Sequence, residues 1–247
     1  MIINSLQLNY NYITMRILKS AINWIKKLWE IFLQILIPPD IKIQKLLKLS
    51  VGEMRDLLPK SPVNSKDIFV LFDYSHKIVR LIIKSIKYKN NTDIKKRIAI
   101  YLYEELMVIS SEIALFEGTL PILVPMPMSK KEKRNRGFNQ CEEICKEIKK
   151  LAGDNIKISY NTLKKVRETE RQTKLSREQR LENVEESMCA FLRSEATIKT
   201  QHPERSEGKR TVIVLDDVYT TGASLSEARR ALTSAGARRV IGLFIAH

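Results

Sequence analysis

The stretch TVIVLDDVYTTGAS, residues 211–224, combines an apolar run, two adjacent aspartates and a turn rich in hydroxyl groups. Residues 211–215 are mostly β-branched and are followed by polar residues, which is typical of a buried parallel strand. From Ser224 onward apolar residues recur at helical spacing, and Gly236 marks the expected end of that helix. Residues 239–245 then have the pattern of a second strand. The stretch therefore predicts a strand, a helix and a strand, with ligands bound beyond the carboxyl ends of the strands.

The turn that follows the aspartates has the composition of a phosphate-binding loop. Its backbone N–H groups and hydroxyls can converge on one point at the start of a helix. The residues concerned are Thr220, Thr221, Gly222, Ala223 and Ser224. Asp216 and Asp217 are poor neighbours for a phosphate but good acceptors for vicinal sugar hydroxyls, and a 5-phosphoribosyl group offers both. Acid pairs at strand ends also occur in phosphoacceptor domains and as helix caps, so these alternatives remain open.

A second cluster of chemically informative residues follows a predicted strand at 121–125. In LVPMPMSKKEKRNRGFNQ (123–140) a Pro-x-Pro segment restricts the backbone and leaves Met128 and Ser129 to supply N–H groups at a turn. The next residues include the cations Lys130, Lys131, Lys133, Arg134 and Arg136. Their charge can neutralise a diphosphate with its Mg²⁺, although a solvated basic face explains most of the same charges.

A third cluster is VRETERQTKLSREQRLENVEESMCAF (166–191), an ordered series of polar residues around Leu175. Taken in their order along the chain, the three clusters resemble the signature blocks of the ComF-like competence proteins, a branch of the type I phosphoribosyltransferase superfamily. The resemblance covers roughly residues 68–247. It implies that residues 211–224 are the motif that binds phosphoribosyl pyrophosphate (PRPP), and that residues 166–191 are a flexible loop that closes over it.

The resemblance also assigns roles to individual residues. The implied catalytic residues are Asp216, Asp217, Arg167 and Gln172. The implied binding residues are Thr220, Thr221, Gly222, Ala223, Ser224, Met128, Ser129, Arg136 and Asn139. The implied reaction is Mg²⁺-dependent displacement of pyrophosphate at C1 of a ribose by an unknown acceptor, with the Mg²⁺ arriving with PRPP and no metal ligand assigned to the protein. If transfer has been lost, the same site would bind PRPP or a nucleotide as a signal.

The expected fold is α/β, with a type I phosphoribosyltransferase-like, mostly parallel sheet flanked by helices. This domain is predicted over 67–247, with a polar insertion at 193–210, and a helical appendage is predicted over 1–66. The predicted elements before the insertion are strands at 68–72 and 121–125 and helices at 75–87, 92–113 and 138–152. ComF-like proteins commonly carry a four-cysteine zinc module before the transferase domain, but residues 41–67 contain no cysteine. No zinc site is expected, and Ser50 with Glu53 predicts a capped helix there instead.

The N-terminal region shows a strongly amphipathic pattern over 13–37, where apolar residues recur at intervals of three and four. Such a helix packs onto its own domain, pairs with a partner helix or lies on a membrane surface, of which the first is favoured. No signal peptide or apolar span of about 20 residues is evident. Three cysteines without a C-x-x-C pair are typical of a reducing cytoplasm, where we expect the protein to be soluble, with Cys141 and Cys145 packed in the core.

The chain of 247 residues has 43 Lys and Arg against 28 Asp and Glu, a formal net charge of +15. This charge favours polyanionic partners, namely PRPP, a nucleotide or nucleic acid. Three functions therefore compete: a phosphoribosyltransferase, a PRPP-sensing regulator, and a competence accessory protein that handles single-stranded DNA and contacts a helicase or recombination partner. The sequence leaves open the acceptor, turnover, the oligomeric state and the roles of 13–37 and 193–210.

Overall fold

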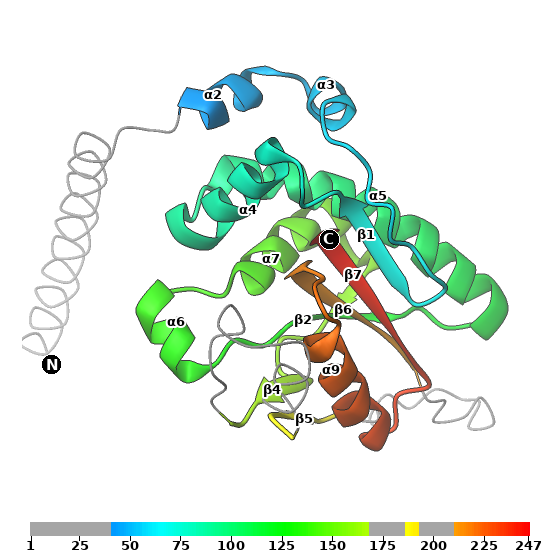
Figure 1. Cartoon of the computed structure of the whole chain (residues 1–247). Coiled ribbons are helices and arrows are strands. Elements are labelled where there is room, and N and C mark those ends of the chain that lie inside the picture. The colour runs from blue at the N-terminus through cyan, green and yellow to red at the C-terminus, as the bar shows by residue number, and fades with distance from the viewer. Residues whose placement is uncertain (1–40, 168–185, 193–209) are drawn as a thin grey trace, which may run out of the picture. The chain divides into compact units, whose positions relative to one another are not determined.

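A computed structural model of the chain describes residues 41–167, 186–192 and 210–247 (Figure 1). The chain divides into two compact units, Met1–Lys48 and Leu49–His247. The described part of the first unit is helix α2 (Ile41–Lys48). The amphipathic pattern predicted over 13–37 and nearly all of the predicted insertion lie outside the described residues.

The second unit is built on a five-stranded sheet with the order β1-β7-β6-β2-β3. The strands are β1 (Ile68–Phe72), β2 (Ile122–Pro125), β3 (Lys157–Ile158), β6 (Thr211–Val218) and β7 (Arg239–Ala246). All of the pairings in this sheet are parallel. The predicted fold class, a mostly parallel sheet flanked by helices, is therefore confirmed. Strand β6 lies at the centre, and its apolar run agrees with burial on both faces.

Helices cover the two faces of the sheet (Figure 1). One face carries α4 (Lys77–Lys89), α5 (Thr92–Glu117) and α7 (Gln140–Ala152), and η1 (Gly153–Asn155) follows α7. The other face carries α9 (Ala223–Ser234) and a two-stranded antiparallel ribbon of β4 (Leu163–Lys165) and β5 (Met188–Ala190). The predicted helices and strands are present with ends shifted by a few residues. The largest shift at a functional position is in β6, which runs past Leu215 because its pairing with β7 continues to Val218.

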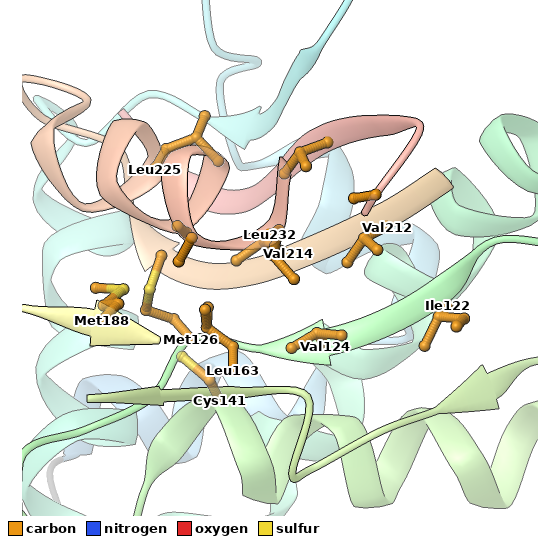
Figure 2. Packing of buried hydrophobic residues seen from close by; sticks show 14 of the residues in the cluster. Ile122, Val124, Met126, Cys141, Leu163, Met188, Val212, Val214, Leu225 and Leu232 are labelled. Atoms are coloured by element: carbon orange, nitrogen blue, oxygen red, sulfur yellow. The ribbon is translucent and has the colours of Figure 1, made fainter. Parts of the chain in front are cut away.

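The core beneath α9 shows which way the side chains of β6 point (Figure 2). Val212 and Val214 are fully buried and lie in one cluster with Leu225 and Leu232 of α9. Successive side chains of a strand alternate between the two faces of the sheet. The two aspartates, as consecutive residues of β6, therefore leave the strand on opposite faces.

Residues 49–66 lie in the same unit as the sheet, although the sequence places them with the appendage over 1–66. Helix α3 (Val51–Asp56) has the predicted capping box. The hydroxyl of Tyr101 in α5 donates a hydrogen bond of 2.6 Å to the carbonyl of Val51. Lys60 forms a bridge with Phe72 of β1. These contacts join residues that are distant in the sequence, so composition alone does not reveal them.

Substitution Tyr101→Phe is expected to lower the free energy of unfolding by about 1 kcal/mol, because it removes the hydrogen bond to the Val51 carbonyl while keeping the ring. Urea unfolding of the full chain measures the change. Tyr103→Phe, two residues away on the same helix, is the matched control and should have a smaller effect. Equal stability of Tyr101→Phe and the wild type would contradict the attachment of α3 to α5.

Candidate functional site

Asp217 is held by side chains from two helices. Its side chain is nearly buried; Oδ1 lies 2.9 Å from Nζ of Lys87, and Oδ2 accepts a hydrogen bond of 2.6 Å from Nε2 of Gln140. Lys87 is in the last turn of α4, and Gln140 is the first residue of α7. Both carboxylate oxygens of Asp217 are thus engaged by the protein itself.

Asp216 has a different environment, although it is adjacent in the chain. Its Oδ1 accepts a hydrogen bond of 2.8 Å from the backbone N–H of Asp217 and lies 3.5 Å from Sγ of Cys141. Burial, together with the negative charge of Asp217, raises the pKa of Asp216 to about 7, while that N–H and the charge of Lys87 oppose the rise. Asp216 therefore changes its charge near neutral pH.

The charge of Lys87 is secured by the acids beside it. Burial lowers the pKa of Lys87, but the ion pair and hydrogen bond with Asp217 and the charge of Asp216 outweigh burial, so the pKa is raised overall. Lys87 is consequently charged at physiological pH. Lys87 is not among the site residues that the sequence analysis names, because its role depends on a contact that is distant in the chain.

Gln140 connects the acid pair to the basic segment. Nη1 of Arg136 donates a hydrogen bond of 2.5 Å to Oε1 of Gln140, whose Nε2 donates to Asp217. The guanidinium of Arg136 also lies 5.5 Å from the ring centroid of Tyr88. Since a side-chain amide has one accepting and one donating end, both ends of Gln140 are used. Arg136, Gln140, Asp217 and Lys87, here called the anchor chain, form one continuous polar path.

The basic segment forms a helix that the sequence did not predict, α6 (Lys130–Arg136). Ser129 caps it: Oγ accepts from the N–H of Glu132 at 3.2 Å, and the N–H of Ser129 donates to the Glu132 carboxylate at 3.4 Å. This N–H was expected to face an anion, whereas here it is engaged within the cap. Ser129 and Glu132 are themselves a capping-box signal that could have revealed the helix. Met128 lies half-buried in the turn before it.

The side chains of α6 bound a concave surface. An open hollow of about 410 Å³ is lined by Lys130, Lys133 and Arg134. Lys133 is also paired with Glu142 of α7 at 3.1 Å, so part of its charge is neutralised. The hollow is open to solvent and is walled mostly by the aliphatic parts of these three side chains, whose cationic ends can meet an anion.

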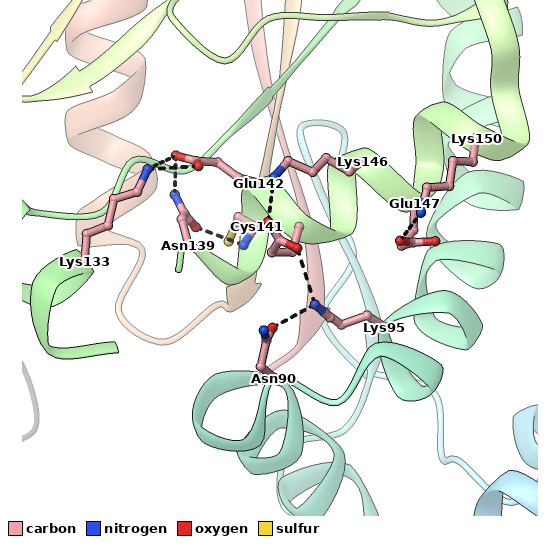
Figure 3. A network of polar contacts seen from close by, with 10 residues as sticks. Asn90, Lys95, Lys133, Asn139, Cys141, Glu142, Lys146, Glu147 and Lys150 are labelled. Atoms are coloured by element: carbon pink, nitrogen blue, oxygen red, sulfur yellow. Dashed lines mark hydrogen bonds and ion pairs between the residues drawn. The ribbon is translucent and has the colours of Figure 1, made fainter. Parts of the chain in front are cut away.

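Asn139 acts as a structural link in this part of the site. Its Oδ1 caps α7 by accepting from the N–H of Cys141 at 2.9 Å (Figure 3). Its Nδ2 donates to the carbonyl of Met126 at 3.0 Å. Nδ2 also lies 3.2 Å from Oε1 of Glu142. Asn139, which the resemblance placed among the binding residues, is buried and used to join α7 to the loop after β2.

A second polar network fixes the end of α4, which carries Lys87 (Figure 3). Lys95 is buried, and its Nζ donates to Oδ1 of Asn90 at 2.8 Å and lies 3.6 Å from Oε2 of Glu143. Asn90 ends α4 in the left-handed conformation, with φ of 49°. Lys95 thereby ties the last turn of α4 to α5 and α7.

The predicted phosphate turn leads directly into α9. Gly222 has φ of 78° and precedes the first residue of the helix, Ala223. A Cβ atom added at Gly222 would lie 2.8 Å from Oη of Tyr219, whose ring packs against Phe244 with centroids 5.0 Å apart. The turn with Thr220 and Thr221 therefore lies between the acid pair and the positive end of the α9 dipole.

Substitution Gly222→Ala is expected to lower the free energy of unfolding by roughly 1–2 kcal/mol, because an L side chain is strained at this φ and would displace Tyr219. Thermal or urea unfolding of the full chain measures it. Gly52→Ala in α3 is the matched control: its added Cβ has open space, so this variant should be unchanged or more stable by about 0.5–1 kcal/mol. Equal effects of the two variants would contradict the strained turn.

The third sequence cluster is described only at its two ends. Arg167 follows β4, and its N–H donates to the carbonyl of Ser187 at 3.3 Å. Strand β5 is held on α9: the N–H of Met188 donates to Glu227 at 2.9 Å, and Arg230 donates to the carbonyl of Met188 at 3.0 Å. Gln172 lies outside the described residues, so the predicted closing loop remains a prediction.

Two further properties bear on the site. Within residues 41–167, 186–192 and 210–247, no group of three or more His, Cys, Asp or Glu residues is arranged to hold a metal ion. In the same described part of the chain, no helix has the length and apolar character needed to cross a membrane. Cys141 and Cys145 are buried, as expected for core residues.

Comparison with known proteins identifies relatives by sequence. No family model matches the chain. Competence protein F of Haemophilus influenzae is 25% identical over 71% of this chain and 71% of its own length. Two proteins named competence protein ComFC, from Bacillus subtilis and Streptococcus pneumoniae, are each 30% identical, over 50% and 47% of this chain respectively. The matches cover 42% and 44% of those two proteins, less than half of their length.

Solved structures with some likeness include two phosphoribosyltransferases. The hypoxanthine-guanine phosphoribosyltransferase of L. donovani matches 61% of this chain and 71% of its own, with 8% identity and a TM-score of 0.34. A hypoxanthine phosphoribosyltransferase of Staphylococcus aureus matches 60% and 62%, with 10% identity and a TM-score of 0.31. These values are low, and the fold class is defined by the parallel sheet itself.

Proposed function

Because the chain is related to the ComF-like competence proteins, we propose that it binds PRPP, or a nucleotide with the same phosphoribosyl group, at the end of β6. The observation that carries the proposal is the arrangement of the acid pair and the turn. Asp216 and Asp217 lie near the carboxyl end of the central parallel strand, and the turn at Gly222 leads from them into the start of α9. Open α/β sheets bind ligands at this edge.

The groups around this edge suit the parts of such a ligand. The N-terminus of α9 and the hydroxyls of Thr220 and Thr221 suit the 5-phosphate. A carboxylate of the acid pair suits the ribose hydroxyls. The cations of α6, which join the acid pair through Arg136 and Gln140, suit the diphosphate.

Mg²⁺ would be held mainly by the oxygens of PRPP itself, since both carboxylate oxygens of Asp217 are already engaged. When bound, the ion supplies neutralisation of charge on the diphosphate. The residues of the chain would then hold and orient the ligand, so that catalysis depends on position and electrostatics rather than on a strong base. Transfer to an acceptor would break the bond between C1 and pyrophosphate, with Arg167 and Gln172 proposed to help exclude water.

Isothermal titration calorimetry with PRPP and with nucleoside monophosphates, each with and without Mg²⁺, tests the proposal. We expect binding of PRPP that strengthens with Mg²⁺. Ribose 5-phosphate and inorganic pyrophosphate serve as partial ligands, and each should bind more weakly than PRPP because each lacks part of the contacts. Absence of PRPP binding at millimolar concentration, with and without Mg²⁺, would refute the proposed function.

The hollow on α6 supports a second candidate, an accessory role in which single-stranded DNA is bound. Lys130, Lys133 and Arg134 line it, and the chain carries a net charge of +15. Such binding should be weak, independent of sequence and strongly dependent on salt. Fluorescence anisotropy of a labelled oligonucleotide across a salt series, with and without Mg²⁺ and PRPP, measures it. Competition by PRPP would place both ligands on one surface, and no binding at low salt would exclude this role.

A further inference from the structure

We propose that the two aspartates of β6 have different roles, and that the contact of Asp217 with Lys87 causes the difference. In this proposal Lys87 is a positioning residue that, with Gln140, holds Asp217 as an internal anchor. Asp216 is then the acid that meets the sugar hydroxyls of the ligand. The proposal rests on the proposed function and goes beyond it, because the sequence motif treats the two acids alike.

The contacts of Asp217 argue against a direct role toward a ligand. The residue is 5% exposed, and its two oxygens are used by Lys87 at 2.9 Å and by Gln140 at 2.6 Å. A ligand hydroxyl could replace these partners only by leaving the shielded ammonium of Lys87 without its counter-charge. Separating a shielded ion pair in this way is costly. Asp217 therefore retains its partners when a ligand binds.

The contacts of Asp216 leave room for a ligand. Both of its hydrogen bonds to described residues, from the Asp217 N–H and from Cys141, are made at Oδ1. Oδ2 has no hydrogen-bond partner among the described residues. The side chain leaves β6 on the face opposite Asp217 and is partly exposed. Asp216 thus has both an accessible oxygen and a fixed orientation, which the Asp217 backbone supplies.

Lys87 is well placed to serve as an anchor because its own position is secured. Lys87 lies three residues before Asn90, which ends α4 in the left-handed conformation. Asn90 accepts a hydrogen bond from the buried Lys95. The ammonium cancels the charge of Asp217. A ligand that carries phosphates then meets one uncompensated carboxylate at the site instead of two.

A double-mutant cycle with Lys87→Met and Asp217→Asn tests the positioning role. Binding of PRPP with Mg²⁺ is measured by calorimetry on the full chain. Each single variant should bind about tenfold more weakly or worse, the scale of one charged hydrogen bond. The double variant should bind PRPP no more weakly than the single variant that binds it less well, because both substitutions break the same ion pair. Losses that multiply in the double variant would overturn the proposal.

Three further variants serve as comparisons for this cycle. Asp216→Asn should weaken PRPP binding, and adding Lys87→Met to it should cost less affinity than Lys87→Met costs alone, since Lys87 acts on the ribose through the orientation of Asp216. Lys87→Arg, which keeps the charge, should restore most of the affinity. Lys84→Met, an exposed residue on the same helix, removes the same charge and should bind as the wild type does. If Lys87→Arg binds PRPP as weakly as Lys87→Met does, or if Lys84→Met loses as much affinity as Lys87→Met, the positioning role is overturned.

Inorganic pyrophosphate with Mg²⁺ distinguishes positioning from direct contact. It lacks a ribose, so Lys87→Met should weaken its binding only through the charge of Asp217 that is left uncompensated, by a smaller factor than it weakens PRPP binding, if Lys87 acts through Asp217. A pyrophosphate loss as large as the PRPP loss would mean that Lys87 contacts the phosphates, and would refute the proposal.

A measurement on the ligand-free protein separates this proposal from the proposed function. Carbon-13 NMR of the side-chain carboxyl groups follows the titration of Asp216. Lys87→Met should move its midpoint to higher pH, because the charge of Lys87 favours the ionised acid, whereas Lys84→Met should not. If the wild type fails to bind PRPP, the proposed function falls, and an unmoved midpoint in Lys87→Met would overturn the anchor independently.

Discussion

The double variant Asp216→Asn with Asp217→Asn is expected to bind PRPP about 10²–10⁴-fold more weakly than the wild type, because two charged hydrogen-bonding groups at about 1.5–3 kcal/mol each are lost. One group is lost at the ligand and the other within the anchor chain. The fold should persist, since asparagine has nearly the same shape as aspartate and the sheet does not depend on the charge. Calorimetry gives the affinity, and circular dichroism checks the fold.

The control for this prediction is Asp154→Asn, which also removes one carboxylate charge but lies in η1, where the side chain is exposed. It should bind PRPP within about twofold of the wild type, because an exposed ion pair contributes little. Unchanged affinity in the double variant, with wild-type binding established, would remove the acid pair from the site.

Asp216→Asn is expected to become progressively more stable than the wild type as the pH rises from about 4 to 7. The folded pKa of Asp216 is raised from its ordinary value of 3.8 to about 7, by burial first and then by the charge of Asp217. Between these values the folded protein retains a proton that the unfolded chain has lost. The stability of the wild type therefore falls over this range, while asparagine does not titrate.

The size of this effect is at most about 4 kcal/mol at pH 7 and above, and partial exposure of Asp216 reduces it. Urea unfolding of both proteins at a series of pH values gives the difference in free energy, in which other titrating groups largely cancel. The difference should rise with pH and level off above about 7. The exposed control Asp154→Asn should show a much flatter difference. A flat difference for Asp216→Asn would show that its pKa is not raised in the folded state.

Much of the fold was predictable because it depends on local periodicity. The apolar runs of β6 and β7 and the helical spacing of α9 lie in one continuous segment, and each follows from the nature of its own residues. Helix α6 was missed because six of its seven residues are charged, the seventh is asparagine, and there is no apolar period. The closing loop that the resemblance assigns to Arg167 and Gln172 remains a prediction.

The candidate site was predictable in its composition but not in its connections. The acid pair and the turn at Gly222 were found because the residues that form them are adjacent in the chain. The resemblance assigns Ser129 and Asn139 to ligand binding, which remains a prediction, and the structure shows that their side chains cap α6 and α7. Side-chain type shows what a residue can bind, but neighbouring donors and acceptors decide what it does bind.

The sequence by itself determined a parallel α/β domain and the presence of two acids before a phosphate-type turn, since strand, helix and turn preferences act between near neighbours. Only the tertiary structure decided that the acids differ. Asp216 and Asp217 leave β6 on opposite faces, and only Asp217 meets Lys87, which is far away in the chain. An ion pair requires its two groups to lie within a few ångströms, and the packing of α4 and α7 against the sheet brings them to that distance.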